Sequence, residues 1–240
     1  MTESVRLSKY LADHFSCSRR EAENYVQGGW VRVDGVVVEE PGFRVGPHQE
    51  VELAKNARAE DHKPATILLH KPMGYGEGAQ SVLDLLTAQN LAPEDRSGRH
   101  FVKADLRNLE VFMPLQAQAS GLLVLTQEYG IARKLSADAA RIEQEYVVEI
   151  EGELPEEGLK LLNHGLMWQG AALPPAKVSW QNENRLRFAL KNAHADAVIV
   201  SMCRQVGLNV LSLKRLRIGR LPMAGLAVGQ WRYLLGYERF

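Results

Sequence analysis

Apolar residues at helical spacing open the chain. Leu7, Leu11 and Phe15 recur on one face of a helix, which predicts an amphipathic helix that buries this face. Ser18, followed three residues later by Glu21, is the pattern of a capping box and predicts the start of a second helix. A Gly-Gly pair then predicts the end of that helix.

The pattern next changes from helical to alternating. Val31 and Val33 flank Arg32, and the Asp34-Gly35 pair predicts a tight turn between two short strands. A further short apolar run, EVEL, predicts a third strand. Residues 1–54 are therefore predicted to form a small domain of two helices followed by a small sheet.

Residues 55–63, KNARAEDHK, are polar and charged and show no periodicity, which predicts a linker. From residue 64 to 240, strand-like runs follow one another in pairs and also alternate with helical runs. This predicts a larger, mixed and mainly antiparallel sheet with flanking helices, and an α+β class for the whole chain. The strand-like runs are TILLH, GLLVLT, EYVVEIEG, RLRFAL and NVLSLKRLRI.

Composition adds limits to this picture. The chain has 240 residues, 45% of them hydrophobic, and a formal net charge of zero, so nucleic-acid binding has to rest on local basic clusters. Cys17 and Cys203 lie far apart without metal-ligand spacing, which predicts reduced thiols and no metal or other cofactor. No apolar run has the length of a signal peptide or a membrane span. We expect a cytoplasmic monomer without membrane contact.

Basic residues of the small domain are candidates for binding phosphate. Those on the two predicted helices and the hairpin can converge on one face, although scattered surface charge is the alternative, because the domain also carries many glutamates. The five candidates are Arg6, Lys9, Arg19, Arg20 and Arg32. Near the C-terminus, Arg215 and Arg217 alternate along a predicted strand, which predicts that they share one face and form a second basic site.

Two stretches carry a resemblance to a known family. The run from residue 6 to 38 resembles the S4-type RNA-binding domain, through SRREAE at the second helix and GWVRVDG at the hairpin. The rest resembles the catalytic domain of the RsuA/RluF group of rRNA pseudouridine synthases, through LLHKPMGY, SGLLVLT and EYVVEI. The resemblance implies a structured RNA partner, an rRNA, and the isomerisation of uridine to pseudouridine.

The loop MPLQAQASGLLVLT departs from that family at its central residue. Its relatives present a catalytic aspartate where this chain has Gln116, and a glutamine amide acts neither as a nucleophile nor as a base at neutral pH. The arginines that the family carries on a late helix are also replaced, by AVIVSM at 197–202. Tyr146 occupies the family's tyrosine position, which implies base stacking; an ordinary packed strand tyrosine is the alternative.

Three hypotheses follow. The first is an RNA-binding, catalytically defective relative of the synthases. The second is an active synthase with a displaced acid, for which Asp105 and Asp138 flank the loop in sequence. The third is a protein-interaction module that docks a partner on the apolar helix at 195–206.

Overall fold

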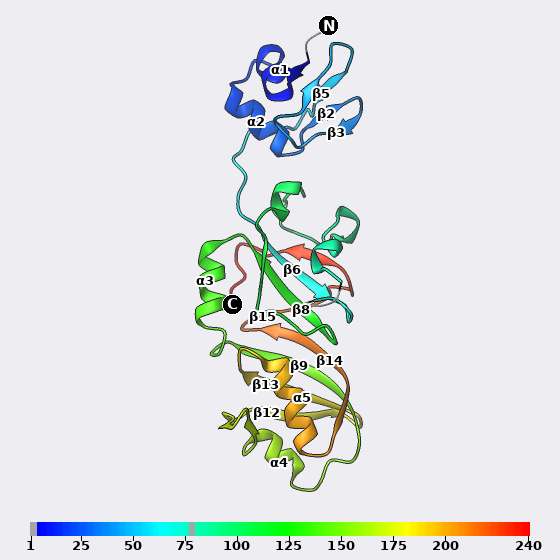
Figure 1. Cartoon of the computed structure of the whole chain (residues 1–240), viewed down its shortest axis with the longest axis vertical. Helices are drawn as coiled ribbons and strands as arrows, with labels where there is room; N and C mark the ends of the chain where they lie inside the picture. The colour runs from blue at the N-terminus through cyan, green and yellow to red at the C-terminus, as the bar shows by residue number, and fades with distance from the viewer. Residues whose placement is uncertain (1–3, 77–79) are drawn as a thin grey trace. The chain divides into compact units, whose positions relative to one another are not determined.

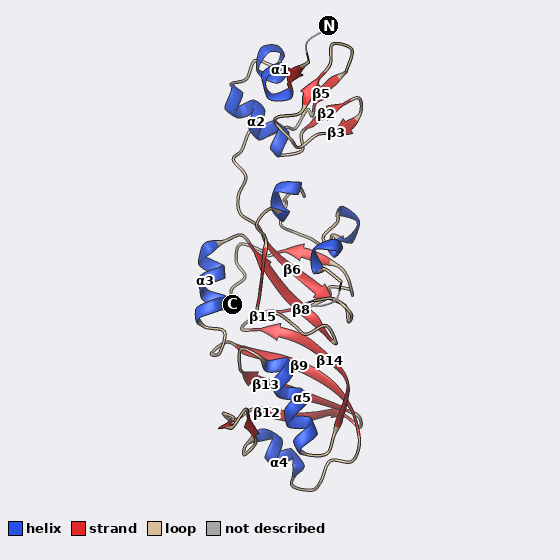
Figure 2. Cartoon of the chain, viewed as in Figure 1, coloured by secondary structure: helices blue, strands red, loops and turns tan. Residues whose placement is uncertain are grey.

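The computed structural model describes residues 4–76 and 80–240. The chain divides into two compact units (Figure 1). The first consists of the residues up to Pro64 together with Arg99–Asn108, and the second of Ala65–Gly98 together with Leu109–Phe240. The helices and strands of each unit are drawn in Figure 2.

The first unit packs two helices on small sheets. Its core consists of Leu7, Leu11, Ala22, Val26, Val31, Val33 and Val45. Its elements are β1 (Val5–Arg6), α1 (Leu7–His14), α2 (Arg19–Gln27), β2 (Val31–Val33), β3 (Val36–Val37), β4 (Arg44–Val45), β5 (Val51–Leu53) and the 3-10 helix Lys103–Leu106. The strands β3, β2 and β5 form one sheet, and β1 pairs with β4.

The local predictions for this unit are confirmed. Ser18 caps α2, because its side chain accepts a hydrogen bond from the Glu21 backbone while the Glu21 side chain accepts one from the Ser18 backbone. Asp34 and Gly35 both have positive φ, 50° and 78°, as the tight turn between β2 and β3 requires.

The segment predicted as a linker clusters with the first unit. Asp61 accepts hydrogen bonds from Arg20 Nη2 at 2.7 Å and from Asn24 Nδ2 at 3.0 Å, which fixes the segment to α2. The boundary between the units falls after Pro64, whereas the predicted small domain ends at residue 54.

Arg99–Asn108 also belong to the first unit. Asp105 is buried there, and its Oδ1 lies 3.0 Å from both His62 Nε2 and Arg99 Nη2. Arg99 Nη2 also donates to the Lys63 carbonyl at 2.6 Å. The prediction assigned all of residues 64–240 to the second domain. It missed the return of Arg99–Asn108 to the first unit, because the contacts that hold this segment join residues far apart in sequence.

The second unit is built on a nine-stranded sheet in the order β12-β13-β9-β14-β8-β6-β16, with β15 paired to β14 and β7 paired to β8. Strands β14 and β8 run parallel, while the other pairings described in this sheet are antiparallel. The predicted α+β class with a mixed, mainly antiparallel sheet is therefore confirmed.

The elements of the second unit follow in chain order. They are β6 (Thr66–Lys71), the 3-10 helices Val82–Leu85 and Ala88–Asn90, β7 (Glu110–Phe112), β8 (Ala119–Thr126), α3 (Tyr129–Ala137), β9 (Glu143–Glu151), α4 (Gly158–Asn163), β10 (Met167–Trp168), β11 (Ala171–Ala172), β12 (Lys177–Asn182), β13 (Arg185–Lys191), α5 (Ala195–Gln205), β14 (Asn209–Ile218), β15 (Leu221–Pro222) and β16 (Trp231–Tyr233).

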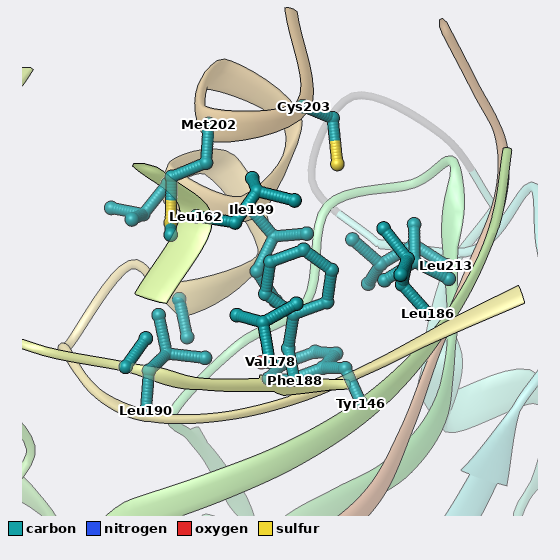
Figure 3. Packing of buried hydrophobic residues seen from close by; sticks show 14 of the residues in the cluster. Tyr146, Leu162, Val178, Leu186, Phe188, Leu190, Ile199, Met202, Cys203 and Leu213 are labelled. Carbon is teal, nitrogen blue, oxygen red and sulfur yellow. The ribbon is translucent and has the colours of Figure 1, made fainter. Parts of the chain in front are cut away.

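Helix α5 is buried against this sheet. Val198, Ile199, Met202 and Cys203 belong to the same core cluster as Phe188 (Figure 3). Burial raises the pKa of the Cys203 thiol to about 12. The apolar character of the helix is thus explained by packing within its own unit.

Within residues 4–76 and 80–240, the structure contains no helix that is long and apolar enough to cross a membrane.

Candidate functional site

A hollow of about 1060 Å³ lies in the second unit around the loop that precedes β8. Its walls come from the end of β6, from β7, from α3 and from the start of α5. Most of the lining is apolar, and its polar side chains include Lys71, Gln116, Gln118, His194 and Asp196.

Gln116 lies in this hollow with an exposed side chain. Its Oε1 accepts a hydrogen bond from Gln118 Nε2 at 3.0 Å. Its backbone nitrogen donates to Asp196 Oδ2 at 2.8 Å, and its carbonyl accepts from the Ala119 nitrogen at 3.0 Å. The residue offers a neutral amide to the hollow.

Asp196 is the residue that sequence reasoning missed. It lies in the first turn of α5, is 7% exposed, and accepts a second backbone hydrogen bond, from the Ala197 nitrogen to Oδ1, at 2.9 Å. Of the lining residues that the structure describes, it is the only one with a carboxylate. An acidic residue in the first turn of a helix is common, so the sequence offered no signal that it would face the loop.

Lys71, at the end of β6, also contacts this loop. Its side chain is fully buried, and its Nζ donates to the carbonyls of Tyr75 at 2.7 Å, Pro72 at 3.1 Å and Ala117 at 3.5 Å. Burial, together with the nearby positive charge of Arg215, lowers the pKa of Lys71 to about 8, while Asp196 opposes the shift. The lysine therefore holds the turn that follows β6 and contacts the loop at Ala117, next to Gln116.

Arg215 points into the second unit. It is 1% exposed, and its guanidinium donates to the Leu122 carbonyl at 2.8 Å, to Gln144 Oε1 at 2.9 Å and to the Met113 carbonyl at 2.7 Å. All of these acceptors belong to the protein, so Arg215 supports β8 and the start of the loop.

Arg217 does not share the face of Arg215, and the prediction that it does is wrong. The register of β14 against β9 shifts between Arg215 and Arg217, and such a bulge interrupts the alternation of side chains along a strand. Arg217 instead donates to Glu143 at 2.6 Å and to Glu145 at 3.0 Å, and its hydrogen bond lowers the pKa of Glu143.

Tyr146 is packed in the core of the second unit (Figure 3). It is 1% exposed, its hydroxyl donates to Gln144 Oε1 at 2.9 Å, and burial raises its pKa to about 12. This placement fits the alternative of a packed strand tyrosine, because a ring that stacks on an RNA base has to reach the surface.

The two acids suggested as replacements lie elsewhere. Asp105 belongs to the first unit and is bound by His62 and Arg99. Asp138 follows α3 and pairs with Lys134 at 3.5 Å. Neither lines the hollow around Gln116.

The five basic candidates of the first unit all have exposed side chains: Arg6, Lys9, Arg19, Arg20 and Arg32. Arg20 forms an ion pair with Asp61 at 2.7 Å, and Arg32 donates to the Gly35 carbonyl at 3.2 Å. Their role in binding RNA stays a prediction. No cluster of His, Cys, Asp and Glu suited to a metal ion occurs among the residues described here.

Comparison with known proteins shows what the chain is similar to. Residues 5–51 match the S4 domain family. The chain is 29% identical to the "Ribosomal large subunit pseudouridine synthase B" of Bacillus subtilis, over 97% of this chain and 93% of that protein. It is 28% identical to the "Dual-specificity RNA pseudouridine synthase RluF" of Escherichia coli, over 98% of this chain and 77% of that protein.

A solved structure described as "Crystal structure of pseudouridylate synthase" covers 96% of both chains with a TM-score of 0.58 at 17% identity, which shows a shared fold. The protein thus combines an S4 domain with the fold of a pseudouridine synthase. Over nearly its whole length the chain is similar to proteins named as pseudouridine synthases, among them RluF.

Proposed function

We propose that this protein binds structured RNA, an rRNA, and does not isomerise uridine. The observation that carries the proposal is the amide of Gln116, exposed in the hollow at the position where the family motif has its aspartate. The S4 domain at residues 5–51 and the relatives named as ribosomal pseudouridine synthases support the choice of ligand.

The chemistry explains why this one position matters. Moving uracil from nitrogen to carbon attachment requires a carboxylate near the sugar, either to attack C1′ or to remove the C2′ proton. An amide performs neither step, and deleting such a group costs about 10⁴- to 10⁶-fold in rate by analogy with hydrolases. The late-helix arginines, one of which supports the aspartate in the family, are also absent at 197–202.

The test is tritium release from rRNA labelled at C5 of uridine, with the Bacillus subtilis relative as the positive control. We expect release by the relative and none above background by this protein. Release by this protein that disappears in an Asp196→Asn variant would refute the proposal.

That outcome would instead support a second candidate function, an active synthase whose acid is Asp196. The observation in its favour is that Asp196 supplies the carboxylate lining the hollow within the described residues. Against it, each oxygen of Asp196 already accepts a backbone hydrogen bond, which leaves it poorly placed to attack a sugar. For a partner-docking role of the 195–206 helix we find no supporting observation, since its apolar side chains lie in the core.

A further inference from the structure

A second hollow, of about 670 Å³, lies wholly within the first unit. Its lining includes three aromatic side chains, Phe15, Trp30 and His100, and two basic ones, Arg32 and Lys55. None of these residues belongs to the hollow around Gln116.

Trp30 and His100 form a stacked pair in this hollow. Their ring centroids are 5.3 Å apart and the rings are inclined by 24°. Gly29 has a φ of +69°, and a Cβ at this position would lie 3.2 Å from His100 Nε2. The close approach of His100 therefore depends on the glycine next to the tryptophan.

His100 comes from the segment Arg99–Asn108, which is anchored to the first unit by its neighbours. Arg99 binds the Lys63 and Pro64 carbonyls at 2.6 Å and 3.2 Å, and Asp105 holds the turn that follows. The aromatic pair is thus assembled from two separate parts of the sequence and held by polar contacts on the His100 side.

We propose that this hollow binds one unpaired RNA base, stacked on the aromatic pair, with Arg32 and Lys55 beside the adjoining phosphates. The inference rests on the proposed RNA binding and assigns a site within it. Stacking on an aromatic side chain contributes about 5- to 100-fold to affinity and tolerates different bases.

The charge balance indicates which contribution dominates. Glu52 also lines the hollow and is the partner of Arg32 in the β2–β5 register, so it offsets one of the two positive charges. Stacking should therefore account for most of the affinity at this site, while the phosphate contacts of Arg32 and Lys55 add only a weak salt dependence.

The experiment compares two labelled RNAs of equal length, a uridine-rich single strand and a blunt-ended hairpin, by fluorescence anisotropy with the full chain. We expect Trp30→Leu and His100→Ala each to weaken binding of the single strand by about tenfold and to change hairpin binding by less than about twofold. Trp30→Phe should recover most of the loss, and the slope of affinity against salt should not change. Trp180→Leu, at an exposed tryptophan of the second unit, is the matched control.

A crosslink on the unaltered protein provides a measurement that does not depend on the folding of a variant. A single strand containing 4-thiouridine should crosslink to the peptides that carry Trp30 or His100. Wild-type affinity in both variants, or crosslinks confined to other peptides, would overturn the base site. If Arg19→Ala or Arg20→Ala still weakened RNA binding, the proposed RNA-binding function would survive the loss of the base site. If the wild-type protein bound neither RNA, the base site and the RNA-binding function would both be refuted.

Discussion

Lys71 places an ammonium group in a fully buried position, where three carbonyls surround it. Its folded-state pKa, about 8, lies below the ordinary lysine value of 10.5. Between these values the unfolded chain binds more protons than the folded one, so this residue makes stability rise as the pH increases from about 8. Below pH 8 the lysine is charged in both states and the slope vanishes.

We therefore compare the free energy of unfolding of the wild-type protein with that of Lys71→Met. The difference, wild type minus variant, should increase by up to about 1 kcal/mol per pH unit between pH 8 and 10. Urea denaturation of both proteins across this range measures the difference, and other titrating groups cancel because both proteins share them. Lys134→Met changes a surface lysine of α3. Its free energy of unfolding should change with pH in the same way as that of the wild type. Parallel curves for Lys71→Met would show that its pKa is not lowered.

Gln116 and Asp196 are coupled through the hydrogen bond from the Gln116 nitrogen to the Asp196 carboxylate. An aspartate at 116 would place a second carboxylate beside Asp196, and like charges that share a site raise each other's pKa. We expect Gln116→Asp to lose stability at pH 7 relative to Gln116→Asn, by about 1 kcal/mol. The loss should fade as the pH falls from the raised pKa of the new carboxyl to the ordinary aspartate value, below which the carboxyl is neutral in both states.

Adding Asp196→Asn should remove this penalty, and thermal or urea unfolding of the four proteins in the cycle measures the coupling. We also expect Gln116→Asp alone to release no tritium from labelled rRNA, because residues 197–202 offer no arginine to support the new carboxylate. Additive effects on stability would contradict the coupling, and turnover by the single variant would show that the missing arginines matter less than we infer.

At the scale of elements, β8 pairs with β14 at Gly121, which lies opposite Arg215. This glycine has a φ of +108°, and a Cβ there would lie 2.9 Å from the Arg215 carbonyl carbon, with the backbone nitrogen and oxygen of Arg215 closer still. Backbone in a central strand cannot yield as a flexible side chain can. We expect Gly121→Ala to reduce the free energy of unfolding by about 3 kcal/mol or more, measured by urea denaturation.

Gly130 supplies the control for this substitution. It lies in α3, and a Cβ there would meet no atom within 4 Å, so Gly130→Ala should be neutral or stabilise by up to about 1 kcal/mol. A similar small effect at both glycines would mean that the strands have room to separate.

Elements governed by local rules were predictable from the sequence. The capping box at Ser18 and the turn at Asp34-Gly35 depend on residues within a few positions of each other, and the structure contains both. The different faces of Arg215 and Arg217 were not predictable in this way, because the bulge between the two residues is set by the pairing of β14 with β9.

At the scale of the whole molecule, the contacts that escaped sequence reasoning join distant segments. Asp196 meets Gln116 across 80 positions, and Arg99–Asn108 return to the first unit through Asp105 and His62. Gln116 itself was found from the sequence because a family motif fixes its register. The surroundings of that residue required the fold, since no local pattern indicates which helix faces the loop.

RNA binding by the whole molecule should depend on salt through the exposed basic residues of the first unit. Removing one basic side chain that binds a phosphate reduces the slope of log affinity against log salt by about one. We expect Arg19→Ala, at an exposed residue of α2, to lower this slope in the full chain.

Arg217→Ala is the control and should leave the slope unchanged, because Arg217 is paired with Glu143 and Glu145. Anisotropy titrations of a labelled rRNA fragment between 50 and 300 mM salt, roughly the range over which such contacts weaken, measure both slopes. A decrease of the slope in Arg217→Ala equal to that in Arg19→Ala would mean that the second unit also contacts phosphate and that its ion pairs open when RNA binds.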